Sequence, residues 1–329
     1  MKYLVVGAGF SGATLARRLA ESGHTVEVIE QKGHVAGHAY DYINSHGIRV
    51  HKYGPHLFHT SNKTVFDFLS RFTEWVPYEH RVVAELKSGE RLPFPPNAYT
   101  KKLVDNPIDV FYRPYTKKMW GRELEEVAPQ ILDRVPGRDD LEDRYFPNDE
   151  YQYMPKHGYT ELIKKMLDHK NIKLFLDMKF LKTDEKYYDH VFNSMPIDEY
   201  YKYEHGMLDY RSIKFHTTSL PIGRHSRHVT INFTHDGPYT RMTEWKNIPE
   251  HAGDDHWTTI TVEEPCDYRD NDLQRYYPVN DDINKSRYQL YKSIPNEKVT
   301  FIGRTGQYVY IDMHQAVNSA LRLAMDYVK

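Results

Sequence analysis

The sequence has few of the features that would take it outside ordinary globular proteins. It holds one cysteine, Cys266, in 329 residues, which excludes an internal disulfide framework and suits a reducing compartment. It has no apolar run long enough to span a membrane and no signal-peptide layout at its N-terminus. We therefore expect a cytoplasmic protein without a membrane span.

Neither positive nor negative charge is in excess. The formal net charge is −2 at pH 7, so nothing favours nucleic acid as a partner, and any anion site must depend on a local cluster. Hydrophobic residues make up 40% of the chain, which is enough for one large domain or two to three intertwined units. Tyrosine is abundant, with 27 copies. Its flat face and hydroxyl suit contacts with sugars, bases and phosphates, although tyrosines can equally fill a core.

The N-terminal third begins with a β-α-β pattern. The apolar, β-branched run "KYLVV" (residues 2–6) predicts a strand, "ATLARRLAESG" (13–23) predicts a helix, and "HTVEVIE" (24–30) predicts a second strand. The glycine-rich turn "GAGFSG" (7–12) joins the first strand to the helix. A G-x-G-x-x-G motif in this context is the fingerprint of dinucleotide binding.

Each residue of this fingerprint has a physical task. Gly7 allows the tight turn, Gly9 lets the backbone approach a pyrophosphate at the helix N-terminus, and Gly12 permits close packing of helix on strand. Glu30, at the end of the second strand, can accept hydrogen bonds from a ribose diol. We therefore expect a dinucleotide cofactor here, against the alternative of a tight turn without a ligand.

The remaining pattern predicts further alternation of helices and strands, followed by a region of mainly β-structure. A turn signal at Ser88-Gly89 predicts a hairpin, and "GYTELIKKMLDH" (158–169) has the spacing of an amphipathic helix. The other expected elements are a charged helical region (97–135), strands at 172–177 and 190–195, β-structure between 206 and 300, and a closing strand, turn and helix (298–329).

The stretch "HKYGPHLFHT" (51–60) holds three histidines, His51, His56 and His59, within nine positions. Such a cluster could ligate a metal, take part in catalysis, or form a wall against a flat ligand. A zinc site would need further ligands at suitable spacing and, for chemistry, an open coordination position.

Several stretches in the same order along nearly the whole chain resemble the UDP-galactopyranose mutases. These flavoenzymes interconvert the pyranose and furanose forms of a nucleotide sugar. The stretches are "HKYGPHLFHT" (51–60), "YTKKMWG" (115–121), "PYTRMTE" (238–244), "YYPVND" (276–281) and "GRTGQYVYIDMHQ" (303–315).

The resemblance implies an α/β fold with three parts. A Rossmann-like domain would bind FAD, a reduced helical domain with a mobile loop would close the site, and a twisted antiparallel β-sheet would hold the substrate. The expected divisions are 1–78, 155–205 and 298–329 for the FAD domain, 97–138 for the helical domain, and 79–96, 139–154 and 206–297 for the sheet domain.

In this family the flavin is active when reduced, yet the reaction has no net redox change. It proceeds through an adduct between flavin N5 and the sugar, so the protein mainly positions groups and stabilises charge. Arginines suit the leaving diphosphate, and Arg134 and Arg241 match the family's catalytic pair. His59, which matches a contact near the flavin edge, is the third residue that the resemblance implies to be catalytic, and Gly54 would give room for the flavin. On this resemblance, the wall is favoured over a metal for the histidines.

The other site residues follow from the same matches. Those expected to contact substrate are Tyr115, Trp120, Tyr145, Arg211, Asn232, Tyr277, Tyr310 and His80. Those expected to contact FAD are Gly7, Gly9, Phe10, Ser11, Gly12, Glu30, Gln31, His38, Ala39, His56, His59, Arg304, Tyr310, Asp312 and Met313. The helix that starts near Asp312 would direct its N-terminal N–H groups at the end of the flavin that becomes anionic on reduction.

The chain departs from the family's pattern at three places. The segment between "LPFPPN" and "YTKKMW" is short, which affects nucleotide recognition and the oligomeric state, for which a homodimer is one expectation. His38 replaces an asparagine near the flavin, and His80 replaces one that faces the sugar. A bulkier, ionisable group at residue 80 points to a substrate other than plain galactose, such as an N-acetylated sugar, a deoxysugar or a sugar on another nucleotide.

Two other functions share parts of this pattern. An FAD-dependent amine oxidase or dehydrogenase would have the same glycine fingerprint, but it predicts net oxidation of the substrate and gives no reason for two arginines at a diphosphate. A non-catalytic protein that binds flavin or a nucleotide sugar would bind its ligand without turnover.

Overall fold

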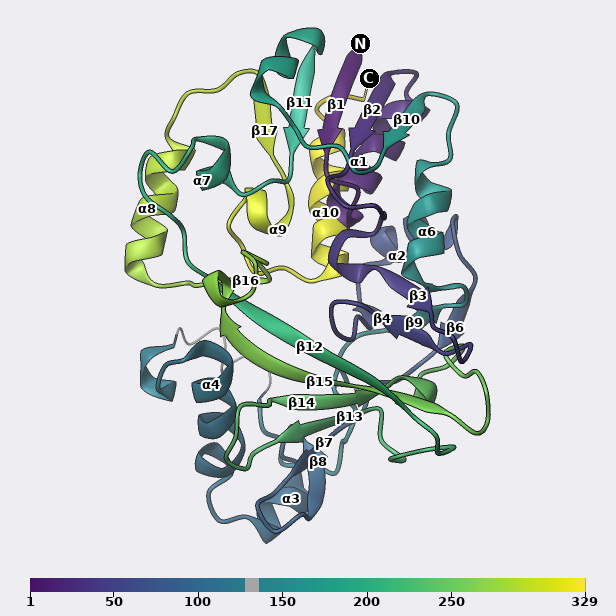
Figure 1. Ribbon diagram of the computed structural model, residues 1–329, viewed down its shortest axis with the longest axis vertical. Helices are drawn as coiled ribbons and strands as arrows, with labels where there is room; N and C mark the ends of the chain where they lie inside the picture. The colour runs from purple at the N-terminus through teal and green to yellow at the C-terminus, as the bar shows by residue number, and fades with distance from the viewer. Residues whose placement is uncertain (128–135, 329) are drawn as a thin grey trace.

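The computed structural model describes residues 1–127 and 136–328. It has two stacked parts (Figure 1): a parallel sheet wrapped in helices above, and long, mostly antiparallel strands below. The two ends of the chain lie near each other at the top of the upper part (Figure 1).

The upper part is built on a five-stranded sheet in which all the strands are parallel. The central strands β1 and β11 are nearly fully buried, as apolar runs predict for a parallel sheet that helices cover. In spatial order the strands are β10 (Ile172–Phe175), β2 (Thr25–Ile29), β1 (Lys2–Val6), β11 (His190–Asn193) and β17 (Val299–Phe301). The β-α-β pattern and the strands expected near 172 and 190 are confirmed.

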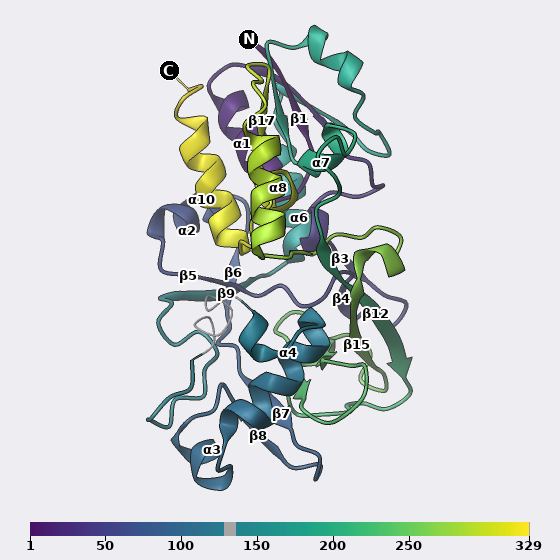
Figure 2. The ribbon, with the colours of Figure 1, turned by 90° about the vertical axis from the view of Figure 1, so that its left-hand side faces the viewer.

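Helices surround this sheet, and α1 packs against both α10 and α6 (Figure 2). The buried side of α1 is made of small residues and leucines, which bring the helix close to the sheet. The helices of this part are α1 (Phe10–Glu21), α2 (Lys63–Ser70), α6 (Gly158–Leu167), α7 (Ile197–Tyr200), α8 (Asp282–Lys292), α9 (Gly303–Gly306) and α10 (Met313–Ala324), with short 3-10 turns at η1 (Gly37–Ala39) and η4 (Lys182–Tyr187).

Two small antiparallel sheets lie between the two parts. One pairs β3 (Asp41–Ile43) with β4 (Arg49–His51), and the other has the order β5 (Phe58–Thr60), β9 (Tyr151–Pro155), β6 (Trp75–Pro77). Strand β9 therefore joins two strands that precede it by about 75 to 95 residues. The exact division into domains stays a prediction.

The lower part is a seven-stranded sheet. Its longest pair, β12 with β15, is antiparallel, whereas β13 and β7 run parallel, so the sheet is not purely antiparallel. In spatial order the strands are β16 (Tyr277–Pro278), β12 (Tyr210–Leu220), β15 (Thr258–Asp267), β14 (Arg241–Glu244), β13 (Thr230–Phe233), β7 (Val82–Glu85) and β8 (Arg91–Phe94). Two 3-10 turns, η5 (Trp245–Asn247) and η6 (Tyr268–Asp270), follow β14 and β15.

The face of β15 that is buried is polar. Thr259, Thr261 and Glu263 are each about 1% exposed and share one face because side chains alternate along a strand. The hydroxyl of Thr261 accepts a hydrogen bond from the Trp245 indole at 2.8 Å and pairs with the hydroxyl of Thr217. Hydrogen bonds thus offset the free-energy cost of burying the threonine side chains on this face of β15. The same face continues to Glu263.

The helical region expected at 97–135 is confirmed within the described residues, but it is broken into short pieces. These are α3 (Ala98–Leu103), a π-helical turn η2 (Ile108–Tyr112), α4 (Arg113–Trp120) and a 3-10 turn η3 (Leu124–Glu126). Helix α4 ends at Gly121, whose φ of +65° is the left-handed conformation of a helix C-cap. Throughout residues 1–127 and 136–328, no helix is long and apolar enough to cross a membrane.

Candidate active site

In the part of the chain that the structure describes, a large cavity of about 1230 Å³ extends from the five-stranded sheet to the seven-stranded sheet. Its upper end is lined by residues at the carboxyl ends of β1, β2, β11 and β17, where open α/β sheets bind their ligands. A site for one small ligand has roughly 300–1,000 Å³. The cavity is therefore large enough for two ligands that meet within it.

Nearly all of the residues predicted from the sequence line this cavity. Those are Gly7, Gly9, Phe10, Ser11, Gly12, Glu30, Gln31, His38, Ala39, His56, His59, His80, Tyr115, Trp120, Tyr145, Asn232, Arg241, Tyr277, Arg304, Tyr310, Asp312 and Met313. The cavity wall thus brings together segments as far apart in the chain as Gly7 and Met313.

Within the glycine turn, different forces require each glycine. A Cβ on Gly7 would lie 2.0 Å from Oγ of Ser194, and a Cβ on Gly12 would lie 2.0 Å from the carbonyl oxygen of Gly7, so the fold itself needs both. A Cβ on Gly9 would meet only Cα of Gly37 at 3.8 Å, which is ordinary contact. Gly9 is the N-cap residue of α1, and no side chain caps the start of this helix. The free N–H groups there make an anion site.

Glu30 follows β2 and is buried, with 7% of its surface exposed. Its carboxylate accepts hydrogen bonds from the backbone N–H groups of Ala8 and Lys32, both at 2.9 Å. It therefore holds the glycine turn in place as well as lining the cavity. Lys32 also lines the cavity and lies over the ring of Tyr53 at 4.2 Å. Sequence reasoning missed this cation, although it stands two residues after Glu30.

The three histidines of residues 51–60 each have a separate partner. The ring of His51 is buried and contacts the ring of His251 at 2.9 Å between Nε2 atoms. His56 Nδ1 bonds the carbonyl oxygen of Gly54 at 2.9 Å, and His59 Nδ1 bonds Asp149 at 2.6 Å. Only His56 and His59 line the cavity. The described residues hold no group of three or more His, Cys, Asp or Glu side chains suited to a metal.

Gly54 is required by the packing of the fold, and its expected role of giving room to the flavin stays a prediction. Its φ is +85°, and a Cβ there would lie 2.9 Å from Phe215 and 3.3 Å from Oε1 of Glu263. The missing side chain thus lets the histidine stretch pack on the seven-stranded sheet. The backbone of this turn also forms part of the cavity wall.

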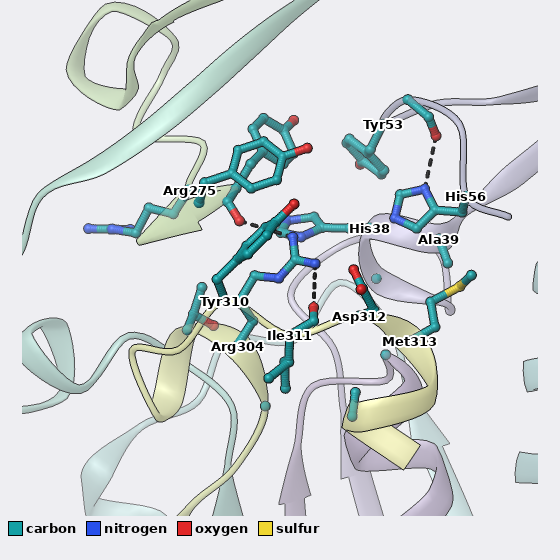
Figure 3. Close-up of a pocket in the computed structure, with 18 of the residues that line it drawn as sticks. His38, Ala39, Tyr53, His56, Arg275, Arg304, Tyr310, Ile311, Asp312 and Met313 are labelled. Carbon is teal, nitrogen blue, oxygen red and sulfur yellow. Dashed lines mark hydrogen bonds between the residues drawn. The ribbon is translucent and has the colours of Figure 1, made fainter. Parts of the chain in front are cut away.

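His38 lies at the centre of the close-up in Figure 3, between Tyr53 and the Arg304 guanidinium. Its ring centroid is 4.8 Å from that of Tyr276 and 5.7 Å from that of Tyr53. Burial lowers the pKa of His38 well below its usual value, with Lys32 and Arg304 adding to the effect. His38 is therefore a neutral, flat group in the cavity wall.

Arg304 is held by the backbone around it. Its guanidinium donates to the carbonyl oxygens of Tyr276 at 3.0 Å and Ile311 at 2.6 Å, and it lies 5.3 Å from the ring of Tyr310 (Figure 3). The cation is thus fixed where α9 leads into α10. Because its position does not depend on a ligand, it can present a preorganised charge to the cavity.

Asp312 caps helix α10. Its side chain accepts from the backbone N–H of Gln315, and the Gln315 side chain accepts from the Asp312 backbone N–H at 2.9 Å, which makes a capping box. The following residues Met313 and His314 also line the cavity. The N-terminus of α10 thus lies at the cavity wall, with one of its N–H groups bonded to Asp312, and the direction of its N–H groups at a flavin stays a prediction.

Arg241 and Glu263 form a buried ion pair on the lower wall. They face each other across β14 and β15, with Nε of Arg241 2.7 Å from Oε2 of Glu263. Burial raises the pKa of Glu263, and the guanidinium of Arg241 opposes that rise. Oε1 of Glu263 has no hydrogen-bond partner within the described residues. The pair aims Arg241 into the cavity and leaves one carboxylate oxygen for a ligand or water. Glu263 was not predicted, but its alternation with Thr259 and Thr261 along β15 was a signal for it.

Aromatic side chains from several elements complete the lower end of the cavity. Tyr115 and Trp120 come from α4, Tyr277 from β16 and Tyr145 from the segment before β9. The rings of Trp120 and Tyr277 meet edge to face at 6.3 Å. These faces suit a base or a sugar.

His80 is buried beside them, with 5% of its surface exposed, and its Nδ1 bonds the hydroxyl of Tyr78 at 2.9 Å. Burial lowers the pKa of His80 to about 3, with Arg241 and His59 adding to the effect. His80 is therefore neutral near pH 7, so its influence on a ligand comes from shape and hydrogen bonding and not from charge.

Two predicted residues are not placed in the cavity. Arg211 donates from Nε to the carbonyl oxygen of Met119 at 2.7 Å and from a terminal nitrogen to that of Lys118 at 3.2 Å, so it supports the C-terminus of α4. This role follows because helix carbonyls need donors, and the predicted contact of Arg211 with substrate stays a prediction. Arg134 lies outside the described residues.

Comparisons with known proteins agree with this arrangement. A family model described as UDP-galactopyranose mutase matches residues 110–310, and one for an NAD(P)-binding Rossmann-like domain matches residues 5–72. The chain belongs to the UDP-galactopyranose mutase family. The predicted family and α/β fold are confirmed, and the protein is an enzyme of the isomerase class.

Relatives in this family match along almost their whole length. A probable UDP-galactopyranose mutase of Klebsiella pneumoniae is 33% identical, with 99% of this chain and 94% of the relative covered. A dTDP-fucopyranose mutase of Escherichia coli is 34% identical, with 100% and 98% covered. The alignments run over 369 and 376 residues, so both relatives carry residues without a counterpart in these 329. Where the missing residues fall stays a prediction.

Solved structures show the same fold. A crystal structure of reduced UDP-galactopyranose mutase has a TM-score of 0.81 at 14% identity and covers 99% of this chain and 93% of that one. A putrescine oxidase variant has a TM-score of 0.57 at 15% identity, with 99% and 98% covered. The mutase family and the oxidase thus share the fold, and the site has to distinguish their functions.

Proposed function

We propose that the protein is a flavin-dependent mutase that interconverts the pyranose and furanose forms of a nucleotide-diphosphate sugar. The observation that carries this proposal is the large cavity that has a dinucleotide cradle at one end and the Arg241–Glu263 pair among aromatic rings at the other. A cofactor bound at the upper end and a nucleotide sugar at the lower end would meet inside this one cavity.

The residues at the upper end fit FAD. Among the described residues only Cα of Gly37, at 3.8 Å, lies near the position of a Cβ on Gly9, and no side chain caps the start of α1, so both are open to a pyrophosphate. Glu30 lies where the ribose would lie. Arg304 and the start of α10 supply positive charge along the same wall. When bound and reduced, the flavin would supply the nucleophile for the anomeric carbon of the sugar.

The chain's own residues would then bind the substrate and stabilise charge. Arg241 suits the diphosphate that leaves and returns, because Glu263 holds its guanidinium in one orientation. The hydroxyls of Tyr277 and Tyr310 would add donors without adding charge. Tyr115 and Trp120 would lie against the base. Arg134 remains a proposed second cation at the diphosphate.

The relatives provide two substrate candidates. One is named for UDP-galactopyranose and the other for dTDP-fucopyranose, and the identities of 33% and 34% do not favour either. The neutral, buried ring of His80 narrows the lower end without adding charge. This arrangement favours a sugar with less polar surface, which a deoxysugar has.

The test is a product analysis with the protein reconstituted with FAD and reduced by dithionite under anaerobic conditions. UDP-galactopyranose and dTDP-fucopyranose are each incubated with it, and the products are separated by chromatography. An isomer of equal mass supports the mutase. An oxidised sugar, or an amine oxidised with consumption of oxygen, supports an oxidase, and bound sugar without any product supports a binding protein.

A further inference from the structure

Two tight turns at the cavity wall hold bulky residues in the left-handed conformation. The turn 201–204 follows α7 and the turn 271–274 follows η6, and each is closed by a hydrogen bond from the backbone N–H of its last residue to the carbonyl oxygen of its first, at 3.3 Å and 2.8 Å. The central φ values are +53° at Lys202, +61° at Tyr203, +49° at Asp272 and +57° at Leu273.

Such turns ordinarily carry glycine, asparagine or aspartate at their central positions, because these residues accept a positive φ at low cost. A tyrosine or a leucine in this conformation strains the backbone. Strain of this kind persists where the surrounding structure enforces it, and it is concentrated at ligand sites. Tyr203 and Leu273 both line the cavity, so the two strained turns face a place where a ligand can bind.

Arg275 joins the two turns. It directly follows the turn 271–274, and its guanidinium donates to Oε2 of Glu199 at 3.1 Å and to the hydroxyl of Tyr203 at 3.4 Å. The guanidinium also lies 5.3 Å from the ring of Tyr268. The second turn is thereby fixed against α7 and the first turn.

The first turn continues the wall that begins at Glu30. The backbone N–H of Met178 bonds the carbonyl oxygen of Glu30 at 2.9 Å, and Met178 and Phe180 both line the cavity. The ring of Phe180 lies beside that of Tyr200, the last residue of α7, with centroids 6.2 Å apart and planes 18° apart. The wall thus runs from the proposed ribose site to the start of the turn 201–204.

This part of the wall offers apolar surface to a ligand. Leu273 is 45% exposed and Met178 is 43% exposed, although both line the cavity. An apolar wall with few polar groups suits the flat face of a base. The adenine of FAD is attached to the ribose that Glu30 would hold, so it reaches the wall next to Glu30. None of these apolar residues was predicted from the sequence.

We propose that the turns 201–204 and 271–274 form a clamp over the adenine of FAD, in which Leu273 contacts the base and Arg275 holds the two turns together. The strained conformation directs the side chain of Leu273 at the ligand. This inference rests on the proposed FAD cofactor but not on the mutase reaction, so measurements of binding and stability are enough to test it.

The test replaces Leu273 by glycine and, in a second variant, by asparagine. Both residues accept a positive φ, so the turn is kept while the apolar side chain is lost. We expect the Kd for FAD to rise about 10-fold in each variant, because the base loses its apolar contact. The midpoint of urea denaturation of the cofactor-free protein should rise in Leu273→Gly, since the strain at this position is relieved. A residue with a purely structural role would not give a more stable protein that binds its cofactor more weakly.

Competition against FAD shows which half of the cofactor is affected. ADP carries the adenosine without the flavin, and FMN carries the flavin without the adenosine. Leu273→Gly should raise the inhibition constant of ADP about 10-fold and change that of FMN less than about twofold.

Glu250→Gly is the matched control. Glu250 also has a positive φ, +60°, and it lies exposed in the segment after η5. Glycine should relieve strain there as well, so the urea midpoint should rise while the Kd for FAD stays that of the wild type.

The inference is overturned if both Leu273 variants bind FAD within about twofold of the wild type. It is also overturned if their stability falls together with their affinity for FAD, or if ADP and FMN are weakened equally. A wild type that binds no FAD would refute the proposed cofactor, and the clamp with it. A wild type that binds FAD but isomerises no sugar would refute the mutase function alone and leave the clamp in place.

Discussion

At the scale of single residues, the Arg241–Glu263 pair has the most direct consequence for function. We expect Arg241→Met to lower kcat by about 100-fold or more, since a preorganised donor to a developing anion is typically worth about 3 kcal/mol. Arg227→Met, in an exposed loop, is the matched control and should leave turnover unchanged. Steady-state kinetics of both variants decide the point, and near-normal turnover of Arg241→Met would remove this residue from the mechanism.

At Gly9, we expect the absence of a side chain to serve ligand binding and not the fold. Its φ of −81° suits any residue, and a Cβ there touches only Gly37 at 3.8 Å. We expect Gly9→Ala to change the free energy of unfolding of the cofactor-free protein by less than about 1 kcal/mol. The amount of FAD that the Gly9→Ala variant binds after reconstitution should nevertheless fall at least about 10-fold, because the methyl group occupies the space of the pyrophosphate.

Gly12→Ala is the contrasting variant, since its Cβ would lie 2.0 Å from the Gly7 carbonyl oxygen. We therefore expect Gly12→Ala, unlike Gly9→Ala, to lower the free energy of unfolding of the cofactor-free protein. Absorbance of bound flavin, together with urea denaturation, measures both effects. Full retention of FAD by Gly9→Ala would show that no ligand approaches this backbone.

At the scale of elements, helix α4 is anchored to the sheet by two cations. Nζ of Lys118 lies within 2.7–3.1 Å of the carbonyl oxygens of Phe233, His235 and Tyr239, and Arg211 bonds the carbonyls at the other side of the helix end. Helix α4 carries Tyr115 and Trp120 into the cavity. These tethers therefore fix the aromatic faces proposed for the base.

Removing the lysine tether should affect binding more than chemistry. Lys118→Met leaves three carbonyl oxygens without their donor, so α4 loses its fixed position and KM for the nucleotide sugar should rise about 10-fold with kcat changed less than about threefold. Lys117→Met, the neighbour on the same helix, removes an exposed pair with Glu123 and should change neither. A fall in kcat at unchanged KM for Lys118→Met would contradict this role.

At the scale of the whole molecule, buried neutral histidines make stability depend on pH. Burial lowers the pKa of His251 to about 4 and that of His56 to about 4, against an ordinary value of 6.5. The unfolded chain then binds more protons than the folded one between pH 6.5 and pH 4, so the free energy of unfolding falls as the pH falls through this range.

For His251 alone, the loss between pH 7 and pH 5 should be about 2 kcal/mol. The His251→Gln variant should therefore lose correspondingly less stability than the wild type over the same interval, whatever its stability at pH 7. His256→Gln, at an exposed position, should follow the wild type. Urea denaturation at the two pH values checks this, and equal losses in wild type and His251→Gln would show that His251 is not held neutral.

Much of the architecture could be predicted from local pattern, because its determinants are local. The apolar run at residues 2–6, the glycine turn and the helix that follows encode the β-α-β unit without help from distant segments. The pairing of β9 with β5 and β6, and the parallel pair of β13 and β7, depend on contacts between distant segments and left no signal in the sequence.

The candidate site divides in the same way. Residues within distinctive motifs, such as Arg241 and Arg304, could be placed because the resemblance covers them, and the structure brings them to one cavity. Glu263, Asp149 and Lys118 could not, since their importance appears only when strand register or a loop brings them to a partner. Arg211 shows the converse, because a predicted substrate residue bonds the end of a helix.

The measurement that tests the account most directly is the dependence of isomerisation on the redox state of the flavin. The wild-type protein loaded with FAD is incubated anaerobically with UDP-galactopyranose or dTDP-fucopyranose, once oxidised and once reduced by dithionite, and the sugars are separated by chromatography. The proposed mutase function predicts a furanose isomer only from the reduced protein, with no oxidised sugar. Isomer formed equally by the oxidised protein, or no isomer from the reduced one, would contradict it.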